Sequence, residues 1–190
     1  MHRTPLITLA TSSLLAGTTI AAPPAYEDLP LGATFAAGDG TASDGVPIDF
    51  GCFEYASGTI TCNGSAEIKS EIPGCNSRNR LELMNLSAKF DYAGSIGSQI
   101  DPIFAFGEYG GNINLAVNGD FRNFANMLDI DGIPIGGCVA KVLSGGTGGD
   151  CGRIQFIGTV DVLAVGGQEF WWDGTRGCDI DFEDLTLGDM

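Results

Sequence analysis

Histidine is almost absent from this sequence of 190 residues, since the only one is His2. His2 lies in an N-terminal segment that we expect to be removed from the mature protein. A chain that keeps no histidine has no Ser-His-Asp triad, no Cys-His pair and no histidine-ligated zinc site. Carboxylates are therefore the main groups left for acid–base chemistry.

Basic residues are also few. Nine Lys and Arg stand against 24 Asp and Glu, and the formal net charge is −15. Such a surface repels nucleic acid and anionic lipid, so we expect no nucleic-acid partner. Beyond residue 22, no uninterrupted apolar run approaches the roughly 18 residues of a transmembrane helix, so we expect no membrane insertion.

Residues 1–22 have the layout of a secretory signal peptide. A short head carries Arg3, the segment 6–21 is apolar, and small residues follow at Ala21 and Ala22 before two prolines. Thr and Ser dilute the apolar segment, so it would span a bilayer poorly. We predict a secreted protein, extracellular or at the cell surface, whose single domain covers residues 23–190.

All six cysteines follow the predicted signal peptide, and an even number in that position indicates disulfides. Cys52–Cys62 and Cys138–Cys151 each enclose a turn-rich stretch, which favours pairing across a hairpin. These two pairs leave Cys75–Cys178 as a long-range bond. Six cysteines allow 15 connectivities, so other pairings stay open. A metal–thiolate site is the competing interpretation, and the lack of any CxxC pair argues against it.

Apolar and polar residues alternate with a period of two through most of the mature sequence. The pattern predicts strands over 86–92, 113–117, 154–162 and 179–183, separated by Asn-Gly, Asp-Gly and Gly-Gly turn signals. The 29 Gly and 11 Phe suit strands joined by tight turns. We therefore predict an all-β fold, an antiparallel β-sandwich of jelly-roll type stapled by disulfides. The one helical candidate is Phe121–Leu128.

Four segments together resemble a known group of domains. They are YEDLPLGATFAAGDG (26–40), SDGVPIDFGCF (43–53), FGEYGGNINLAVNGDFRNF (106–124) and VGGQEFWWD (165–173). They resemble a group of secreted, mainly bacterial β-sandwich domains with FEDLPLG-, FGEYGGN- and GGQE-like motifs. The resemblance implies a β-sandwich fold and a secreted location, and it implies no activity.

Glu108 and Glu169 are the candidate catalytic pair, because each is flanked by glycines and aromatic residues that could pack against sugar rings. A retaining glycosidase needs two carboxyl groups about 5–5.5 Å apart, and an inverting one about 6.5–9.5 Å. The competing interpretation is that both carboxylates bond to tight glycine turns. We favour this interpretation, because two glutamates alone are an unspecific signal for catalysis.

Calcium is the candidate cofactor. Hard cations prefer six to eight oxygen ligands from carboxylates and carbonyls. Glu27 and Asp28 at the start of the domain, with Asp181 and Asp184 at its end, could hold one Ca²⁺ between the first and last strands. The alternative is a solvated acidic face.

A polar row with aromatic neighbours is the candidate ligand site. Amide side chains can donate to and accept from sugar hydroxyls, and aromatic rings pack against sugar faces. The candidate ligand-binding residues are Tyr109, Asn112, Asn114, Asn118, Arg122 and Trp171, with Phe121 beside them. The alternative is the polar outer face of a half-buried strand.

These observations favour a secreted, non-catalytic binding or surface module. The expected partner is carbohydrate or another extracellular matrix component, with a structural calcium ion. One alternative is a small glycoside hydrolase that uses Glu108 and Glu169. Another is a structural coat or fibre subunit that self-assembles through its sheet edges.

Overall fold

The computed structural model describes residues 24–70 and 79–173 of the chain. The predicted signal peptide, the predicted strand over 179–183 and the predicted pair Cys75–Cys178 lie outside these residues. Within the described ranges, no helix combines the length and apolar character needed to cross a membrane.

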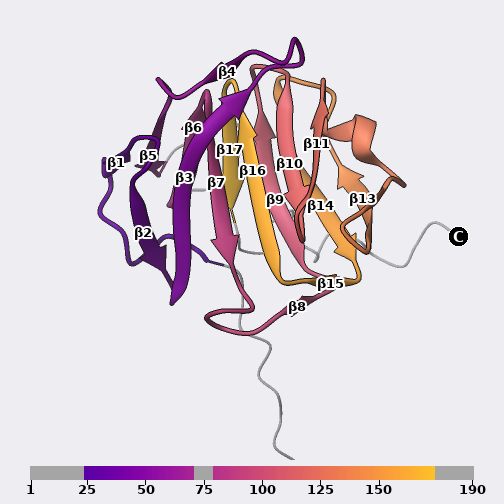
Figure 1. Cartoon of the computed structure of the whole chain (residues 1–190), viewed down its shortest axis with the longest axis horizontal. Coiled ribbons are helices and arrows are strands. Elements are labelled where there is room, and N and C mark those ends of the chain that lie inside the picture. The colour runs from indigo at the N-terminus through magenta and orange to yellow at the C-terminus, as the bar shows by residue number, and fades with distance from the viewer. Residues whose placement is uncertain (1–23, 71–78, 174–190) are drawn as a thin grey trace, which may run out of the picture.

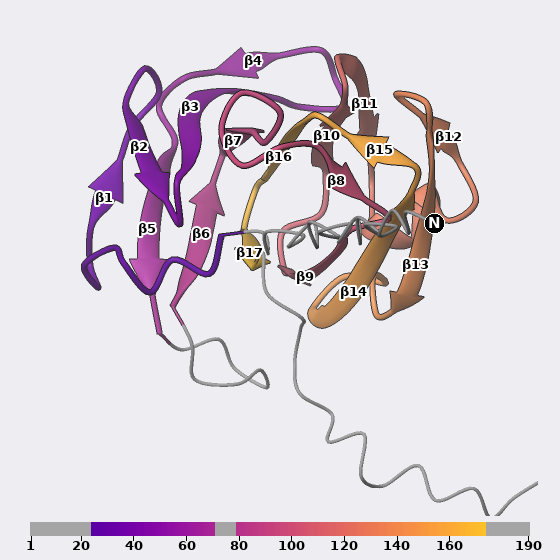
Figure 2. The ribbon, with the colours of Figure 1, turned by 90° about the horizontal axis from the view of Figure 1, so that it is seen from below.

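Two large antiparallel sheets pack face to face (Figure 1, Figure 2). The first sheet has eight strands. In spatial order they are β1 (Thr34–Phe35), β5 (Ser65–Lys69), β6 (Arg80–Met84), β17 (Phe170–Asp173), β9 (Ile103–Glu108), β14 (Asp150–Ile157), β13 (Cys138–Ser144) and β12 (Pro134–Ile135).

The second sheet has seven strands, and it carries the candidate site. In spatial order they are β11 (Asp120–Phe124), β10 (Ile113–Val117), β16 (Val162–Gly167), β7 (Leu86–Asp91), β3 (Val46–Glu54) and β2 (Gly40–Ser43), with β4 (Ile60–Thr61) paired to β3 off this path. β8 (Gln99–Ile100) and β15 (Thr159–Val160) form a separate pair. All pairings are antiparallel, which confirms the predicted all-β antiparallel sandwich.

Alternation along the strands places one apolar row of each sheet in the space between them. In β7, Phe90 is fully buried whereas its neighbour Lys89 is exposed. Aromatic rings fill the centre of the core, where the Trp172 ring lies 4.9 Å from Phe104 and 6.0 Å from Phe170 between ring centroids. Such stacked pairs stabilise a core beyond the apolar area that they bury.

The single long strand predicted over 154–162 is wrong. β14 ends at Ile157, β15 covers Thr159–Val160, and β16 begins at Val162 in the other large sheet. The strand is interrupted at Gly158, because its φ of 134° is a conformation that residues with a Cβ rarely adopt. Period-two alternation continued across the break and concealed it.

The helical candidate Phe121–Leu128 is also wrong. Residues 120–124 form β11, and a 3₁₀ helix, η1 (Met127–Ile130), follows. The cause is the turn before β11, where Asn118 and Gly119 have φ of 49° and 86°. Two positive φ values in a two-residue loop make a type I′ hairpin, which pairs β11 with β10.

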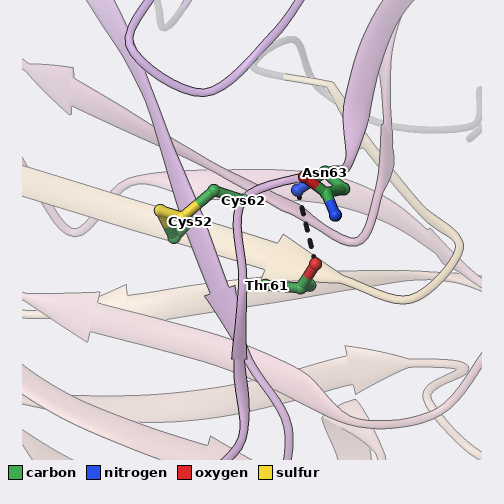
Figure 3. The surroundings of a disulfide bond; sticks show 4 residues. All are labelled: Cys52, Thr61, Cys62 and Asn63. Carbon is green, nitrogen blue, oxygen red and sulfur yellow. Dashed lines mark hydrogen bonds between the residues drawn. A yellow bond between two sulfur atoms is a disulfide. The ribbon is translucent and has the colours of Figure 1, made fainter.

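The disulfide Cys52–Cys62 is confirmed (Figure 3). The predicted pair Cys138–Cys151 is wrong, since Cys138 is a buried free thiol whereas Cys151 is disulfide-bonded. The pairing of β13 with β14 gives the reason. Their turn lies after Ser144, so Cys151 lies near that turn while Cys138 lies at the far end of the hairpin. At about 3.3 Å per residue the two are roughly 20 Å apart, whereas a disulfide needs Cα atoms within about 7 Å.

Candidate functional site

A groove of about 360 Å³ lies on the outer face of the seven-stranded sheet. Its floor consists of the small residues Gly51, Ser87, Ala116 and Ala164, which come from β3, β7, β10 and β16. We call this feature the sheet groove. Its volume falls in the range of about 300–1,000 Å³ that is usual for small-molecule sites.

Strand register explains the shape of the sheet groove. Asp49 pairs with Lys89, Lys89 with Ala164, Ala164 with Ala116, and Ala116 with Phe121. These five residues form one row across five strands, and at about 4.8 Å per strand the row is roughly 19 Å long. The two alanines in its middle leave a depression between a charged pair at one end and an aromatic ring at the other.

The rim of the sheet groove presents two large apolar side chains to solvent. Phe121 on β11 is 47% exposed, and Ile60 on β4 is 63% exposed. At the β3 and β7 side, Lys89 Nζ lies 3.7 Å from a carboxylate oxygen of Asp49, and both side chains are largely exposed. A solvated ion pair of this kind contributes little to stability, so both charges are accessible to a ligand.

The β3–β4 hairpin (residues 53–61) closes the sheet groove at one end of the strands. β3 bends across the sheet, and its end at Glu54 reaches β10 and β11 (Figure 2). Asn112 Nδ2 and Asn123 Nδ2 donate to the carbonyl oxygen of Glu54 at 3.2 and 2.8 Å. The Asn114 side chain accepts from Asn123 Nδ2 at 2.8 Å, and the opposite assignment of its amide oxygen and nitrogen would let it donate to the Glu54 carbonyl and accept from the Glu54 N–H.

The three predicted ligand-binding asparagines therefore hold the backbone in place. Asn112 Oδ1 accepts from the Ala56 N–H at 2.8 Å, which adds to its bond with Glu54. Asn118 Nδ2 donates to the carbonyls of Gly136 and Thr159, and its Oδ1 accepts from the Asp161 N–H, each at 2.8 Å. Asn114 is the one of the three that lines the sheet groove, and it is 4% exposed.

The other predicted ligand residues are divided between the two sheets. Trp171 is on β17 of the eight-stranded sheet and is 6% exposed, with Lys69 Nζ 5.4 Å above its ring. Tyr109 follows β9, and its hydroxyl donates to the disulfide-bonded sulfur of Cys151 at 3.6 Å. Arg122 is on β11 but does not line the sheet groove, because it pairs in register with the buried Leu115; its guanidinium contacts the Asp120 carboxylate at 3.2 Å and lowers the pKa of that carboxyl.

The structure places the two predicted catalytic glutamates in different environments. Glu108, at the end of β9, is 1% exposed, and its Oε2 accepts from the Met127 N–H at 2.9 Å. Glu169 is exposed in the turn between β16 and β17, where its carbonyl oxygen accepts from the Tyr109 N–H at 3.0 Å. Glu108 pairs in register with the inward-facing Phe170, so its side chain points to the core side of the sheet.

Replacing Glu108 with Ala is expected to lower the free energy of unfolding by about 2 kcal/mol, because the buried Met127 N–H loses its acceptor. Urea unfolding followed by circular dichroism measures the change. Glu169→Ala is the matched control, and we expect it to stay within about 0.5 kcal/mol of wild type, as exposed sites usually do. Equal stabilities for the two variants would contradict the structural role of Glu108.

Half of the predicted calcium site lies within the described residues. Asp28 accepts from Ser43 Oγ at 2.6 Å and from the Asp44 N–H at 2.9 Å, and Glu27 accepts from the Asn79 N–H at 3.1 Å. Partial burial raises the pKa of Asp28, but these hydrogen bonds outweigh it and lower the pKa below its ordinary value. Asp181 and Asp184 lie outside the described residues. Among residues 24–70 and 79–173, no three metal-ligating side chains come together.

No protein-family model matches the chain, and neither curated proteins nor solved structures give a significant match. The resemblance to secreted β-sandwich domains with FEDLPLG-, FGEYGGN- and GGQE-like motifs therefore stays a prediction.

Sequence reasoning missed Asp49, Lys89 and Ile60 as members of the site. The signal for Lys89 was present, since it lies on the polar side of a strongly alternating strand. No local signal joins Lys89 to Asp49 or to Phe121, because the row that contains them is made by strands far apart in the sequence.

Proposed function

We propose that the chain is a secreted, non-catalytic module that binds carbohydrate in the sheet groove. The observation that carries this proposal is the exposed Phe121 ring beside a floor of small side chains. An aromatic face can pack against the apolar face of a sugar ring, while a few polar groups orient its hydroxyls. Lys89, Asp49 and Glu54 line the same groove and supply a donor and acceptors.

The negative charge of the sheet groove and of the whole chain indicates which class of carbohydrate could bind. Asp49 and Glu54 outnumber Lys89 in the sheet groove, and the whole chain carries a formal charge of −15. Acidic polysaccharides would approach against this field, so the proposed ligand is a neutral glycan.

Native gel electrophoresis through gels that contain soluble neutral or acidic polysaccharides tests the proposal. Neutral polysaccharide is expected to retard the wild-type protein. Phe121→Ala should weaken that binding about tenfold or more, because a stacking contact of about 1.5 kcal/mol is lost. Ala116→Leu should weaken it as well by filling the floor of the groove.

Ile157→Ala is the matched control. Ile157 is 45% exposed, much like Phe121, but it is on β14 of the other sheet. Its retardation should equal that of wild type. If no polysaccharide retards the wild-type protein, or if Phe121→Ala is retarded as strongly as wild type, the proposal fails.

The glycoside hydrolase and the coat or fibre subunit stay predictions. A buried Glu108 that already accepts a backbone hydrogen bond and an exposed Glu169 do not favour the hydrolase. The calcium ion also stays a prediction, and the described half of its site is engaged in protein hydrogen bonds.

A further inference from the structure

The two arms of the β3–β4 hairpin are held by different kinds of bond. The β3 arm and the turn after it are bonded to the body of the molecule by asparagine side chains at Glu54 and Ala56. Tyr55 adds a bond from its hydroxyl to Asn85 Oδ1 at 2.9 Å. The β3 arm therefore stays in place independently of the disulfide.

The β4 arm depends on β3. Within the described part of the chain, β4 pairs with no strand other than β3, through the two register pairs Phe53–Thr61 and Glu54–Ile60. Directly after β4, the covalent bond from Cys62 to Cys52 ties the arm down (Figure 3). These two residue pairs, with the bond from the Tyr55 N–H to the Thr59 carbonyl oxygen at 2.8 Å, make only a short ladder, so the disulfide adds a strong covalent constraint on the position of Ile60.

The same disulfide is part of the candidate site and is open to solvent. Cys52 lines the sheet groove, and Cys52 and Cys62 are both exposed. Ile60, two residues before Cys62, forms the rim of the groove on the hairpin side. Exposed disulfides are the ones that thiol reagents and oxidoreductases reach, and they include the labile and regulatory ones.

We infer that Cys52–Cys62 is a redox-sensitive disulfide that holds β4, and with it Ile60, beside the sheet groove. We call this disulfide the latch. A dithiol reductant attacks one sulfur as a thiolate, forms a mixed disulfide and releases the other cysteine as a thiolate. The second thiol of the reductant then displaces the first cysteine. The reductant leaves as a disulfide, and its two electrons and two protons are on Cys52 and Cys62. The freed β4 arm carries Ile60 away from the groove and weakens ligand binding, a consequence that rests on the proposed function.

The double variant Cys52→Ala/Cys62→Ala isolates the latch without reducing the disulfide of Cys151. Backbone NMR order parameters of Ile60 and Thr61 are expected to fall from about 0.85 to below about 0.6, while those of Glu54 stay high. In the gel assay, the double variant should bind neutral polysaccharide about tenfold more weakly, as expected when one apolar wall contact is lost. Cys138→Ala, which removes a thiol outside any disulfide, is the control and should match wild type in both measurements.

The two measurements separate this inference from the proposed function. Order parameters at Ile60 and Thr61 that stay near 0.85 in the double variant would overturn the latch, even if Phe121→Ala confirms the binding site. Order parameters that fall while wild type binds no polysaccharide would support the release of β4 and refute the carbohydrate site. Order parameters that fall while polysaccharide binding is unchanged would overturn the regulatory role of the disulfide.

Discussion

Replacing Arg80 with Met is expected to lower the free energy of unfolding by about 3–5 kcal/mol, the usual cost of breaking a buried ion pair by removing one partner. Arg80 Nε lies 3.6 Å from a carboxylate oxygen of Asp173, and each side chain is 3% exposed. The methionine fills a similar volume but removes the positive charge that faces the buried carboxylate. Urea unfolding at neutral pH, followed by tryptophan fluorescence, measures the loss.

Lys89→Met is the matched control for Arg80→Met. Its ion pair with Asp49 has nearly the same N···O distance, 3.7 Å, but the side chains are 53% and 69% exposed. Solvent screens such a pair, so the control should change stability by less than about 1 kcal/mol. The double variant Arg80→Met/Asp173→Leu should recover much of the loss, because it removes both buried charges. A small loss in Arg80→Met would show that the buried pair contributes little.

Gly136→Ala is expected to lower the free energy of unfolding by about 3 kcal/mol. Gly136 has a φ of 55°, and a Cβ at this position would clash with the carbonyl oxygen of Val117. The left-handed conformation costs a residue with a Cβ about 1–2 kcal/mol, and overpacking adds about 1–3 kcal/mol. The clash involves backbone at the end of β10, so no side-chain rotation relieves it.

The adjacent glycine separates the two causes. Gly137 has a φ of 81°, but a Cβ there would meet nothing within 4 Å. Gly137→Ala should therefore cost only the conformational part, about 1–2 kcal/mol. Thermal or urea unfolding of both variants gives the comparison. Equal losses would mean that backbone conformation, and not the contact with Val117, accounts for the requirement at Gly136.

The fold class could be predicted from the alternation of apolar and polar residues. The errors in that prediction arise where the backbone conformation changes the course of the chain. Alternation over 86–92 and 113–117 predicted β7 and β10 nearly to the residue, since period two is the direct signature of a half-buried strand. The same pattern ran through Gly158, where a glycine conformation moves the chain to another sheet. The turn-rich stretch between Cys138 and Cys151 indicated a hairpin but not the position of its turn, which sets which residues face each other, so the predicted pairing was wrong.

The candidate site was predicted only in part. The region from Asn112 to Arg122 does contribute Asn114, Ala116 and Phe121 to the sheet groove. The chemistry of asparagine was read correctly as hydrogen bonding, but its partners are backbone groups of the β3–β4 hairpin. Sequence alone cannot distinguish these two uses of an amide, because the hairpin is more than fifty residues earlier in the chain and reaches β10 only through the bend of β3.

The order of strands bears on how this protein is made. The last two described strands occupy interior positions, with β16 between β10 and β7 and β17 between β6 and β9 (Figure 1). A nascent chain that has emerged only as far as β11 therefore has both sheets split into halves with open edges. The 49 residues that follow Phe124, up to and including Asp173, take about 2–10 s to synthesise at about 5–20 residues per second. During those seconds unpaired strands can associate with other chains, so the growing polypeptide needs its edges shielded until β16 and β17 arrive.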